Sequence, residues 1–345
     1  MPVVGLDLGR HNFRAVELTR DKNGIVLNKF GSYENPKLNL ESATKEDITA
    51  YAAAVREFFN EVGFESRGVV VSLPEYQVFM RVIKLPEMSD KDLKNSIPYQ
   101  AEQYIPMPSK EVDLAYQKID SDYDTKGKMN VLLVAAKKTI SRAYVEILKE
   151  AKLTPRGLEP EALAIGRSLG DTIDHPTASV IVNIGVGSTL IIITYRGFVR
   201  FTRSVPVGGE ILTRSVQQAL GLDQAQAEEY KKAYGLDSNY ADGKIFNALK
   251  PVFDNVVMEI RRSNIFFTTH NPNVTINRVI LSGGTALMPG LLFYMATNLD
   301  MEVELANPWR NITLSPKLES QKDKLLEQGP AFATTVGLAL KELQN

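Results

Sequence analysis

The segment Val3-Val-Gly-Leu-Asp-Leu-Gly-Arg-His-Asn12 places a short run of aliphatic residues before an Asp-x-Gly turn. The segment Ser179-Val-Ile-Val-Asn-Ile-Gly-Val-Gly-Ser188 repeats this arrangement in the second half of the chain. Aligning the two places Asn183-Ile-Gly185 on Asp7-Leu-Gly9. This self-similarity predicts an internal duplication, and therefore two related lobes with a cleft between them.

Each copy of the turn belongs to a run of strands. In the first copy, residues 3–8, 13–18 and 25–30 are rich in β-branched residues, a helical apolar period follows at 45–62, and a buried strand is predicted at 69–73. The second copy has the same opening. It predicts strands at 179–184, 189–195, 198–205 and 278–281, with helices at 210–220, 224–234, 246–267 and 331–343, the last of them after Gly329-Pro330.

The stretch 75–155 between the two copies has another character. It predicts strands at 78–85, 113–119 and 130–136, a helix at 90–104 that is interrupted near Pro98, and a helix at 141–151. We therefore expect an α/β protein of duplicated βββαβα units with a small inserted α+β subdomain. The first lobe would comprise residues 1–74, 156–177 and 329–345, and the second lobe residues 178–328.

The composition limits the possible partners and compartments. The chain carries 40 Lys and Arg against 41 Asp and Glu, so no excess charge attracts nucleic acid or an anionic membrane. The absence of cysteine excludes a disulfide framework, a thiolate metal site and a Cys nucleophile. No apolar run reaches the ~18 to 20 residues of a membrane span, and no signal peptide is recognisable. We expect a cytoplasmic protein that reaches the membrane only through a partner.

The first turn has the features of a phosphate site. Asp7 at a strand end can hold a hydrated Mg²⁺, and the backbone N–H groups beside Gly9 can approach a phosphate. Taken alone, the motif also fits a hairpin turn with an exposed Asp. Its second copy favours the phosphate interpretation, because two turns facing each other would bind phosphates from both sides.

Two further motifs each have an alternative explanation. Gly283-Gly284, with Thr285, lies between a strand and a helix, where the backbone can approach a flat or charged group, but tight strand-to-helix packing explains it equally well. Glu228 and Lys231 share one helix face, which is also typical of a solvated helix surface.

These segments, in this order, resemble the actin-like ATPase superfamily, in which two phosphate motifs, two connecting helices and an adenosine motif surround a nucleotide. Within that superfamily the chain resembles the PilM family of type IV pilus assembly proteins. The segments that carry the resemblance are 101–108 with Tyr116-Gln117, 158–164, 205–210 and 282–291.

The resemblance implies an ATP site built from main-chain amides and a few charged side chains. Its first phosphate motif would be Asp7, Gly9, Arg10, His11, Asn12 and Arg14, and its second Asn183, Gly185, Gly187, Ser188 and Thr189. Around the ribose and adenine would lie Gly208, Gly209, Glu228 and Lys231, with Gly283, Gly284 and Thr285 under the base. Asp7 would hold Mg²⁺ through water, and Glu159 matches the connecting-helix carboxylate that orients the attacking water.

The chain departs from the family pattern at three of these positions. Arg10 stands where a small hydroxyl residue is usual, Arg14 replaces a Lys, and Asn183 replaces an Asp. An uncharged amide binds Mg²⁺ and positions water less well than a carboxylate. We therefore expect ATP binding with at most slow hydrolysis.

The insert is the expected partner site, because in PilM relatives the corresponding subdomain receives the cytoplasmic N-terminal peptide of the inner-membrane protein PilN. An extended apolar peptide needs a groove between a helix and a sheet. The residues predicted to line it are Ile97, Ala101, Tyr104, Ile105 and Met107. Ile97 and Ala101 are equally well explained as part of the insert's own core.

The resemblance implies an ATP-binding adaptor of the type IV pilus inner-membrane assembly, which links PilN to the cytoplasmic machinery. A cell-division protein resembling FtsA is the first alternative. A sugar kinase of the same superfamily is the second, and the cytoplasmic part of a type II secretion protein resembling GspL is the third.

Overall fold

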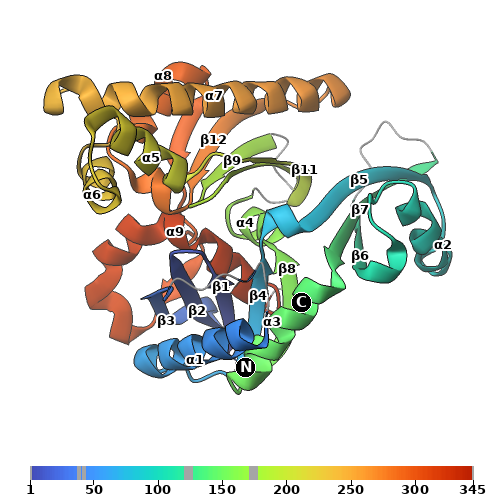
Figure 1. Ribbon diagram of the computed structural model, residues 1–345. Coiled ribbons are helices and arrows are strands. Elements are labelled where there is room, and N and C mark those ends of the chain that lie inside the picture. The colour runs from blue at the N-terminus through green and yellow to red at the C-terminus, as the bar shows by residue number, and fades with distance from the viewer. Residues whose placement is uncertain (1, 37–39, 41–43, 120–126, 171–177, 344–345) are drawn as a thin grey trace.

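The structure, a computed structural model, describes residues 2–36, 40, 44–119, 127–170 and 178–343. Two α/β lobes face each other, the second lying above the first in Figure 1, with a smaller insert beside them. Each lobe and the insert has its own sheet. None of the described helices is both long and apolar enough to pass through a lipid bilayer.

The first lobe is built on a mixed sheet in which β1 pairs antiparallel with β2 and parallel with β4. Helix α1 (Lys45–Val62) covers one face of this sheet. It begins at a capping box made by Thr44 and Asp47, and it ends at Gly63, whose φ is 71°. Among the described residues, the strands in spatial order are β14 (Ile312–Leu314), β3 (Gly24–Glu34), β2 (Asn12–Asp21), β1 (Val3–Leu8), β4 (Gly68–Leu73) and β8 (Thr154–Pro160).

The second lobe repeats this plan. Strand β10 pairs antiparallel with β9 and β11, and β12 pairs parallel with β9. The neighbour order β11-β10-β9-β12 matches β3-β2-β1-β4, so the predicted duplication is confirmed. Among the described residues, the strands in spatial order are β11 (Phe198–Val205), β10 (Thr189–Tyr195), β9 (Ala178–Ile184), β12 (Ile276–Ser282) and β13 (Glu302–Leu305).

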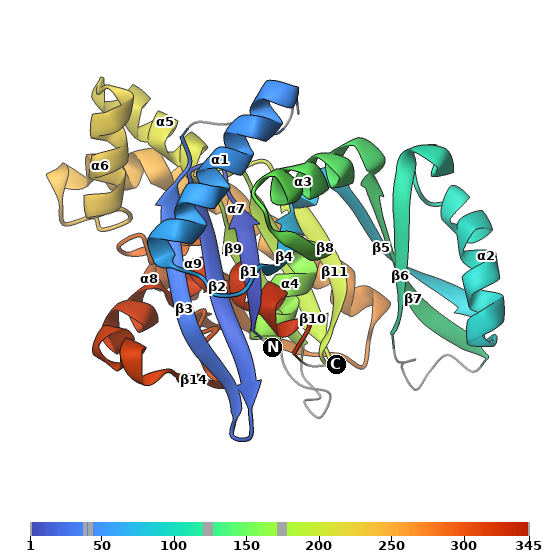
Figure 2. The ribbon, with the colours of Figure 1, turned by 90° about the horizontal axis from the view of Figure 1, so that it is seen from below.

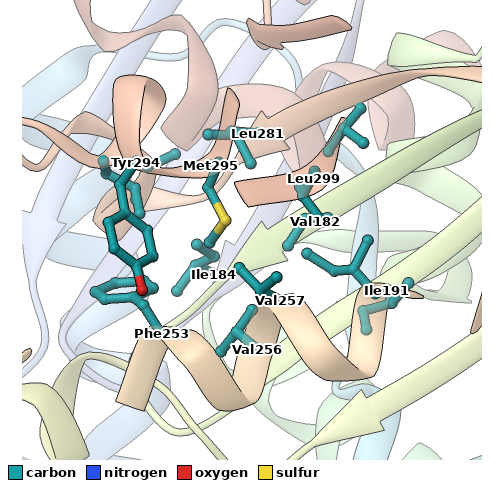
Figure 3. Packing of buried hydrophobic residues seen from close by; sticks show 14 of the residues in the cluster. Val182, Ile184, Ile191, Phe253, Val256, Val257, Leu281, Tyr294, Met295 and Leu299 are labelled. Atoms are coloured by element: carbon teal, nitrogen blue, oxygen red, sulfur yellow. The ribbon is translucent and has the colours of Figure 1, made fainter. Parts of the chain in front are cut away.

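Helices α5 (Gly209–Leu220), α7 (Lys244–His270) and α8 (Leu291–Leu299) cover the second sheet, and α6 (Gln224–Tyr234) follows α5. Figure 3 shows the core between sheet and helices, where Val182 and Ile184 of β9 lie among side chains of α7 and α8. The aliphatic and aromatic side chains of this core exclude water, and burial of their apolar surface contributes about 25 cal/mol per Å². The end of β9, where the second turn begins, is thereby fixed.

The insert is an antiparallel sheet of β5 (Val78–Pro86), β7 (Lys128–Lys137) and β6 (Val112–Ile119), in that spatial order, with α2 (Asp90–Glu102) on one face. The predicted break at Pro98 is wrong, because α2 is continuous through it. The N–H that proline lacks would have bonded to the carbonyl of Lys94, and Lys94 is exposed to water.

Helix α3 (Lys138–Glu150) belongs by its packing to the first lobe rather than to the insert. Tyr144, Ile147 and Leu148 are buried in the core that α1 forms with the first sheet, and Figure 2 shows α1 and α3 side by side. The insert's own core therefore ends with β7, before the expected boundary at residue 155. Strand β14, expected in the second lobe, pairs with β3 of the first sheet. The boundary at residue 177 lies outside the described residues.

Helices α4 (Glu161–Leu169) and α9 (Lys322–Leu340) meet between the lobes. Helix α4 packs on the second sheet and α9 on the first, and they approach so closely that a Cβ on Gly337 would lie 1.8 Å from the carbonyl oxygen of Ala164. The predicted start of the last helix at residue 331 is wrong, since α9 begins at Lys322 and contains Pro330. The carbonyl oxygen of Pro330 accepts hydrogen bonds from Gly283 N and Ser282 Oγ, which ties this part of the helix to the second lobe.

Several short 3₁₀ segments complete the described elements. They are η1 (Glu75–Gln77), η2 (Ser109–Glu111), η3 (Ala241–Gly243), η4 (Gly284–Leu287) and η5 (Pro316–Gln321).

Candidate functional site

A cavity of about 880 Å³ opens between the two lobes, and both duplicated turns border it. Its volume is in the range of small-molecule sites. Most residues predicted from the sequence to bind nucleotide line this cavity, namely Asp7, Gly9, Arg10, His11, Asn12, Arg14, Asn183, Gly185, Gly187, Ser188, Gly209, Glu228, Lys231, Gly283, Gly284 and Thr285. The fold thus brings together residues that are up to 278 positions apart in the sequence, from Asp7 to Thr285.

The first turn carries charge into the cavity. Asp7 lies opposite Arg14 in the β1–β2 register, and Ser72 Oγ donates a 2.6 Å hydrogen bond to Asp7 Oδ1. Burial raises the pKa of Asp7, although the hydrogen bond from Ser72 and the charge of Arg14 act against that rise. Burial also lowers the pKa of Arg14, which the charge of Asp7 partly offsets. The two groups form a partly desolvated acid–base pair at the end of β1.

The second turn supplies backbone groups and no charged side chain. Gly185 N donates to Ser188 O at 2.9 Å, which closes the turn, and Gly209 N donates to Gly185 O at 3.0 Å. Thr189 and Gly208, both expected at the cavity, lie behind this turn. Thr189 is buried and its Oγ1 donates to a backbone carbonyl, while a Cβ on Gly208 would lie 2.5 Å from Val186 O. They support the turn from the rear.

The far side of the cavity is formed by α5, α6 and η4. Lys231 Nζ donates to Glu228 Oε2 at 2.7 Å and to Gly209 O at 3.1 Å. Burial raises the pKa of Glu228, but hydrogen bonds from Lys231 and Thr213 outweigh this and lower it to about 2. Gly283 has φ 86°, and a Cβ there would lie 2.4 Å from the carbonyl oxygen of Ile184. Only glycine fits at this position, which explains why the sequence carries it.

The predicted catalytic residue Glu159 lies outside the cavity. Its carboxylate is buried and accepts hydrogen bonds of 2.7 and 2.6 Å from the guanidinium of Arg167. Glu161, two residues later at the first turn of α4, lines the cavity instead. The Glu-Pro-Glu sequence offered both carboxylates. Only the course of the chain from β8 into α4 decides which one reaches the cavity.

Glu75 and Glu161 form an acidic end of the cavity that the sequence analysis did not identify. Burial, followed by the charges of Asp7 and Glu75, holds the pKa of Glu161 well above its ordinary value. Burial raises the pKa of Glu75 to about 7, against hydrogen bonds from Thr202 and the backbone of Ala162. Glu75 is partly exposed as a residue, yet its Oε2 is enclosed and accepts no hydrogen bond from the described residues. A buried carboxylate oxygen without a hydrogen bond disfavours the charged form, in agreement with the raised pKa.

A second cavity, of about 580 Å³, lies where the insert meets the first lobe. Its walls come from β6, β7, α3 and the end of β8, and they include Leu114, Val134, Val145 and Leu158. In the described part of the chain β6 and β8 are both edge strands. An apolar groove between open strand edges is suited to an extended peptide.

The residues predicted to contact a partner lie on the other face of the insert sheet. Ile97, Ala101 and Ile105 are buried in the insert's core, and Tyr104 and Met107 pack against it. The prediction that the buried three line a groove is therefore wrong. Side chains alternate between the faces of a strand, so in β7 residues 131, 133 and 135 face α2, whereas 134 and 136 face the second cavity.

The two cavities share their walls. At three places one residue lines the second cavity, and its neighbour in the chain lines the cavity between the lobes. These pairs are Leu73 with Pro74, Val145 with Tyr144, and Pro160 with Glu161, the first of each pair lining the second cavity. A movement of any of these segments changes both cavities.

A family model described as type IV pilus assembly protein PilM matches residues 5–343. The chain belongs to the PilM family. A solved structure described as a PilM-PilN type IV pilus biogenesis complex is 26% identical to it, with a TM-score of 0.85 and 99% of each chain covered. The full-length match to the PilM family favours a role in pilus assembly over the cell-division alternative.

Other relatives of this PilM family member share the fold at lower similarity. Cell division protein FtsA of Bacillus subtilis is 23% identical over 355 aligned positions, which cover 88% of this chain and 78% of FtsA. MreB5 of Spiroplasma citri, solved with bound AMPPNP, is 15% identical with a TM-score of 0.55, covering 99% of this chain and 96% of MreB5. The predicted actin-like fold is confirmed.

Proposed function

We propose that this PilM family member is a cytoplasmic ATP-binding adaptor of the type IV pilus inner-membrane assembly. The cavity between the lobes would hold MgATP, and the second cavity would hold the N-terminal peptide of a PilN partner. The observation that carries the proposal is the position of the two duplicated turns, which border one cavity from opposite lobes. Backbone amides from both turns can then contact the same chain of phosphates.

The residues at the acidic end of the cavity fit a hydrated magnesium ion. In the described part of the chain no cluster of three His, Cys, Asp or Glu side chains could hold a metal ion. Mg²⁺ commonly keeps several waters and binds through one or two carboxylates plus phosphates. Asp7 and Glu161 would accept hydrogen bonds from its waters. Bound Mg²⁺ would neutralise phosphate charge.

Slow hydrolysis is the expected chemistry of such a site. Glu161 is the carboxylate within the cavity that can orient a water molecule, and we assign it the role predicted for Glu159. Asn183 offers no second negative charge at the end of β9. The site therefore has groups that bind the nucleotide and few that activate water, which suits an adaptor whose state depends on nucleotide occupancy.

The peptide proposal rests on the second cavity. An extended peptide can hydrogen-bond to the free edge of β6 or β8, while its alternate apolar side chains enter the space beside Val145 and Leu158. Because Tyr144 and Glu161 lie on the nucleotide side of the same segments, peptide binding and nucleotide binding would affect each other. By thermodynamic linkage any such coupling is reciprocal.

Calorimetry with MgATP tests the nucleotide proposal. The protein should bind MgATP, and Asp7→Ala should weaken binding at least tenfold, about 1.4 kcal/mol, because the first turn loses its carboxylate. Glu159→Gln is the matched control, since it removes a carboxylate outside the cavity. No detectable binding at millimolar MgATP would refute the proposal.

A synthetic peptide from the PilN N-terminus tests the partner proposal. Val145→Glu, which places a charge in the second cavity, should weaken the peptide at least tenfold, whereas Tyr104→Ala on the opposite face should change its affinity little. Ile265→Glu is the control, because Ile265 is 65% exposed on α7, far along the chain from the insert. The reverse result, with Tyr104→Ala the damaging variant, would move the groove to the face of α2.

A further inference from the structure

Helix α3 forms one of the three walls that the two cavities share. Its residue Tyr144 lines the cavity between the lobes, and the next residue, Val145, lines the second cavity. The other two shared walls are the ends of β4 and β8, where Leu73 pairs with Pro160 in the first sheet. Backbone pairing fixes these two strands, whereas side chains fix α3. Because packed helices can slide past their neighbours by small amounts, α3 is the shared wall best able to move.

The hydroxyl of Tyr144 has no hydrogen-bond partner among the described residues. Tyr144 is 4% exposed as a residue, yet its oxygen remains open to the cavity between the lobes. Burial, followed by the charges of Asp7 and Glu161, holds the pKa of Tyr144 well above its ordinary value, so the group keeps its proton and can donate it in a hydrogen bond. A buried donor without a partner is costly, so an acceptor oxygen that enters this end of the cavity is bound favourably.

Another face of α3 belongs to the second cavity. The residues of α3 that line it follow the spacing of one helix face, and they are Ser141, Arg142, Val145, Glu146 and Lys149. Ser141 Oγ also donates a hydrogen bond to the carboxylate of Asp113 in β6, which forms another wall of this cavity. A displacement of α3 therefore changes the groove that a peptide would enter.

We propose that Tyr144 couples the two cavities. Its hydroxyl donates a hydrogen bond to an oxygen of the occupant of the cavity between the lobes, and α3 transmits the resulting shift to the second cavity. This inference rests on the proposed function, because it takes MgATP and the peptide as the two occupants. It deepens that function by naming the group on which the coupling depends. Tyr144 is a positioning residue, since it acts on the peptide through α3.

Calorimetry of the PilN peptide on the full chain, with and without saturating MgATP, measures the coupling. In the unmodified protein MgATP should change the dissociation constant of the peptide at least about threefold. Tyr144→Phe removes the hydroxyl and keeps the ring, so it should reduce this change to less than about 1.5-fold, while peptide affinity without nucleotide stays within about twofold.

Hydrogen exchange of the α3 amides gives a second readout. MgATP should alter this exchange in the unmodified protein and leave it unaltered in Tyr144→Phe. Thermal unfolding of Tyr144→Phe should not occur at a lower temperature, because the substitution removes a buried hydroxyl that has no partner among the described residues. A simple loss of packing would instead lower the unfolding temperature.

Tyr51→Phe is the matched control. Tyr51 lines the same cavity and is 3% exposed, but its hydroxyl is hydrogen-bonded to Asn35. It lies on α1, whose described residues do not line the second cavity. Tyr51→Phe should therefore keep the response of the peptide to MgATP.

A response that persists in Tyr144→Phe would overturn the proposal, as would a response that Tyr51→Phe abolishes equally. Its absence from the unmodified protein, with both ligands bound, would also overturn it. If the unmodified protein fails to bind MgATP or the peptide at all, the proposed function fails and the coupling fails with it, so the two failures are distinguishable.

Discussion

The two duplicated turns each join a pair of antiparallel strands, but they carry different charges. In the first, Asp7 faces Arg14 across the β1–β2 register, and in the second, the corresponding positions hold Asn183 and Leu190. The charged side chains are found on the first turn alone. The comparison teaches that one half of a duplicated site can set its electrostatics while the other half supplies shape.

The two turns also differ in the groups that surround them. The first turn lies beside Ser72 and the carboxylates of Glu75 and Glu161, which come from the first lobe and α4. The second is fastened from behind by backbone hydrogen bonds, in which Gly209 N and Glu210 N donate to carbonyls of the turn at 3.0 and 2.9 Å. Removal of a charged side chain should therefore affect the first turn, whereas a substitution that displaces the backbone should affect both turns.

Removal of the polar side chain from each turn is the strongest way to break this comparison. Asp7→Ala leaves the buried Ser72 hydroxyl without its acceptor and Arg14 without the carboxylate opposite it, so the free energy of unfolding should fall by about 2 kcal/mol. Asn183→Ala removes a neutral amide and should cost about 1 kcal/mol or less. Urea denaturation without nucleotide measures the free energy of unfolding of both variants. Equal losses would contradict the proposed difference in electrostatics between the two turns.

The pH dependence of stability should also originate from the groups around the first turn. The pKa of Glu75 is about 7 in the folded protein against a reference value of 4.5, so between these pH values the folded state holds more protons than the unfolded chain. Stability should therefore fall as pH rises from about 4.5 to 7 and then level off. Glu161 and Asp7, whose pKa values are also raised, contribute in the same direction.

Glu75→Gln should remove roughly 2 kcal/mol of that fall, and the charges of Glu161 and Asp7 should maintain the rest. Urea midpoints at pH 5, 6, 7 and 8 provide the measurement. Asn183→Ala serves as the control, because it removes no titrating group and should shift the whole curve by a constant amount. A Glu75→Gln curve parallel to that of the unmodified protein would contradict the assignment.

Alanine at the matched glycines sharpens the comparison of backbones. A Cβ on Gly9 would lie 2.6 Å from Asn12 O, whereas a Cβ on Gly185 would lie 3.2 Å from Ser188 O. Gly9→Ala must displace backbone and should cost about 1.5 kcal/mol, while Gly185→Ala should cost about a third of that. Thermal or urea unfolding distinguishes them, and a larger loss at Gly185 would show that the second turn is the tighter one.

The smallest effect is expected from giving the second turn a charge. Asn183→Asp adds a carboxylate opposite Asp7, so affinity for ATP should rise about threefold with Mg²⁺ and fall by a similar factor in EDTA, less than about 1 kcal/mol each way. Calorimetry under the two conditions measures the difference. An identical response with and without Mg²⁺ would mean that Asn183 lies too far from the metal to matter.

Local patterns predicted most elements of both lobes, because alternation and helical period report directly on which residues face a core. They failed at Pro98 of α2 and at Pro330 of α9, although the predicted helix at 246–267 does run through Pro251 of α7. Pro330 lies inside α9, and its carbonyl accepts hydrogen bonds from residues of the second lobe. The residues around Pro330 in the sequence do not indicate these distant hydrogen-bond donors.

The sequence by itself determined the duplication, the two glycine turns and the family, since these depend on residue types at fixed spacing. The tertiary structure alone decided that Glu161 rather than Glu159 reaches the cavity, and that β6 of the insert and α3 of the first lobe, rather than α2, line the second cavity. It also placed Arg10 against Glu210 of the other lobe. The physical reason is that these outcomes depend on which face of a packed element remains open, and packing joins segments that no local pattern relates.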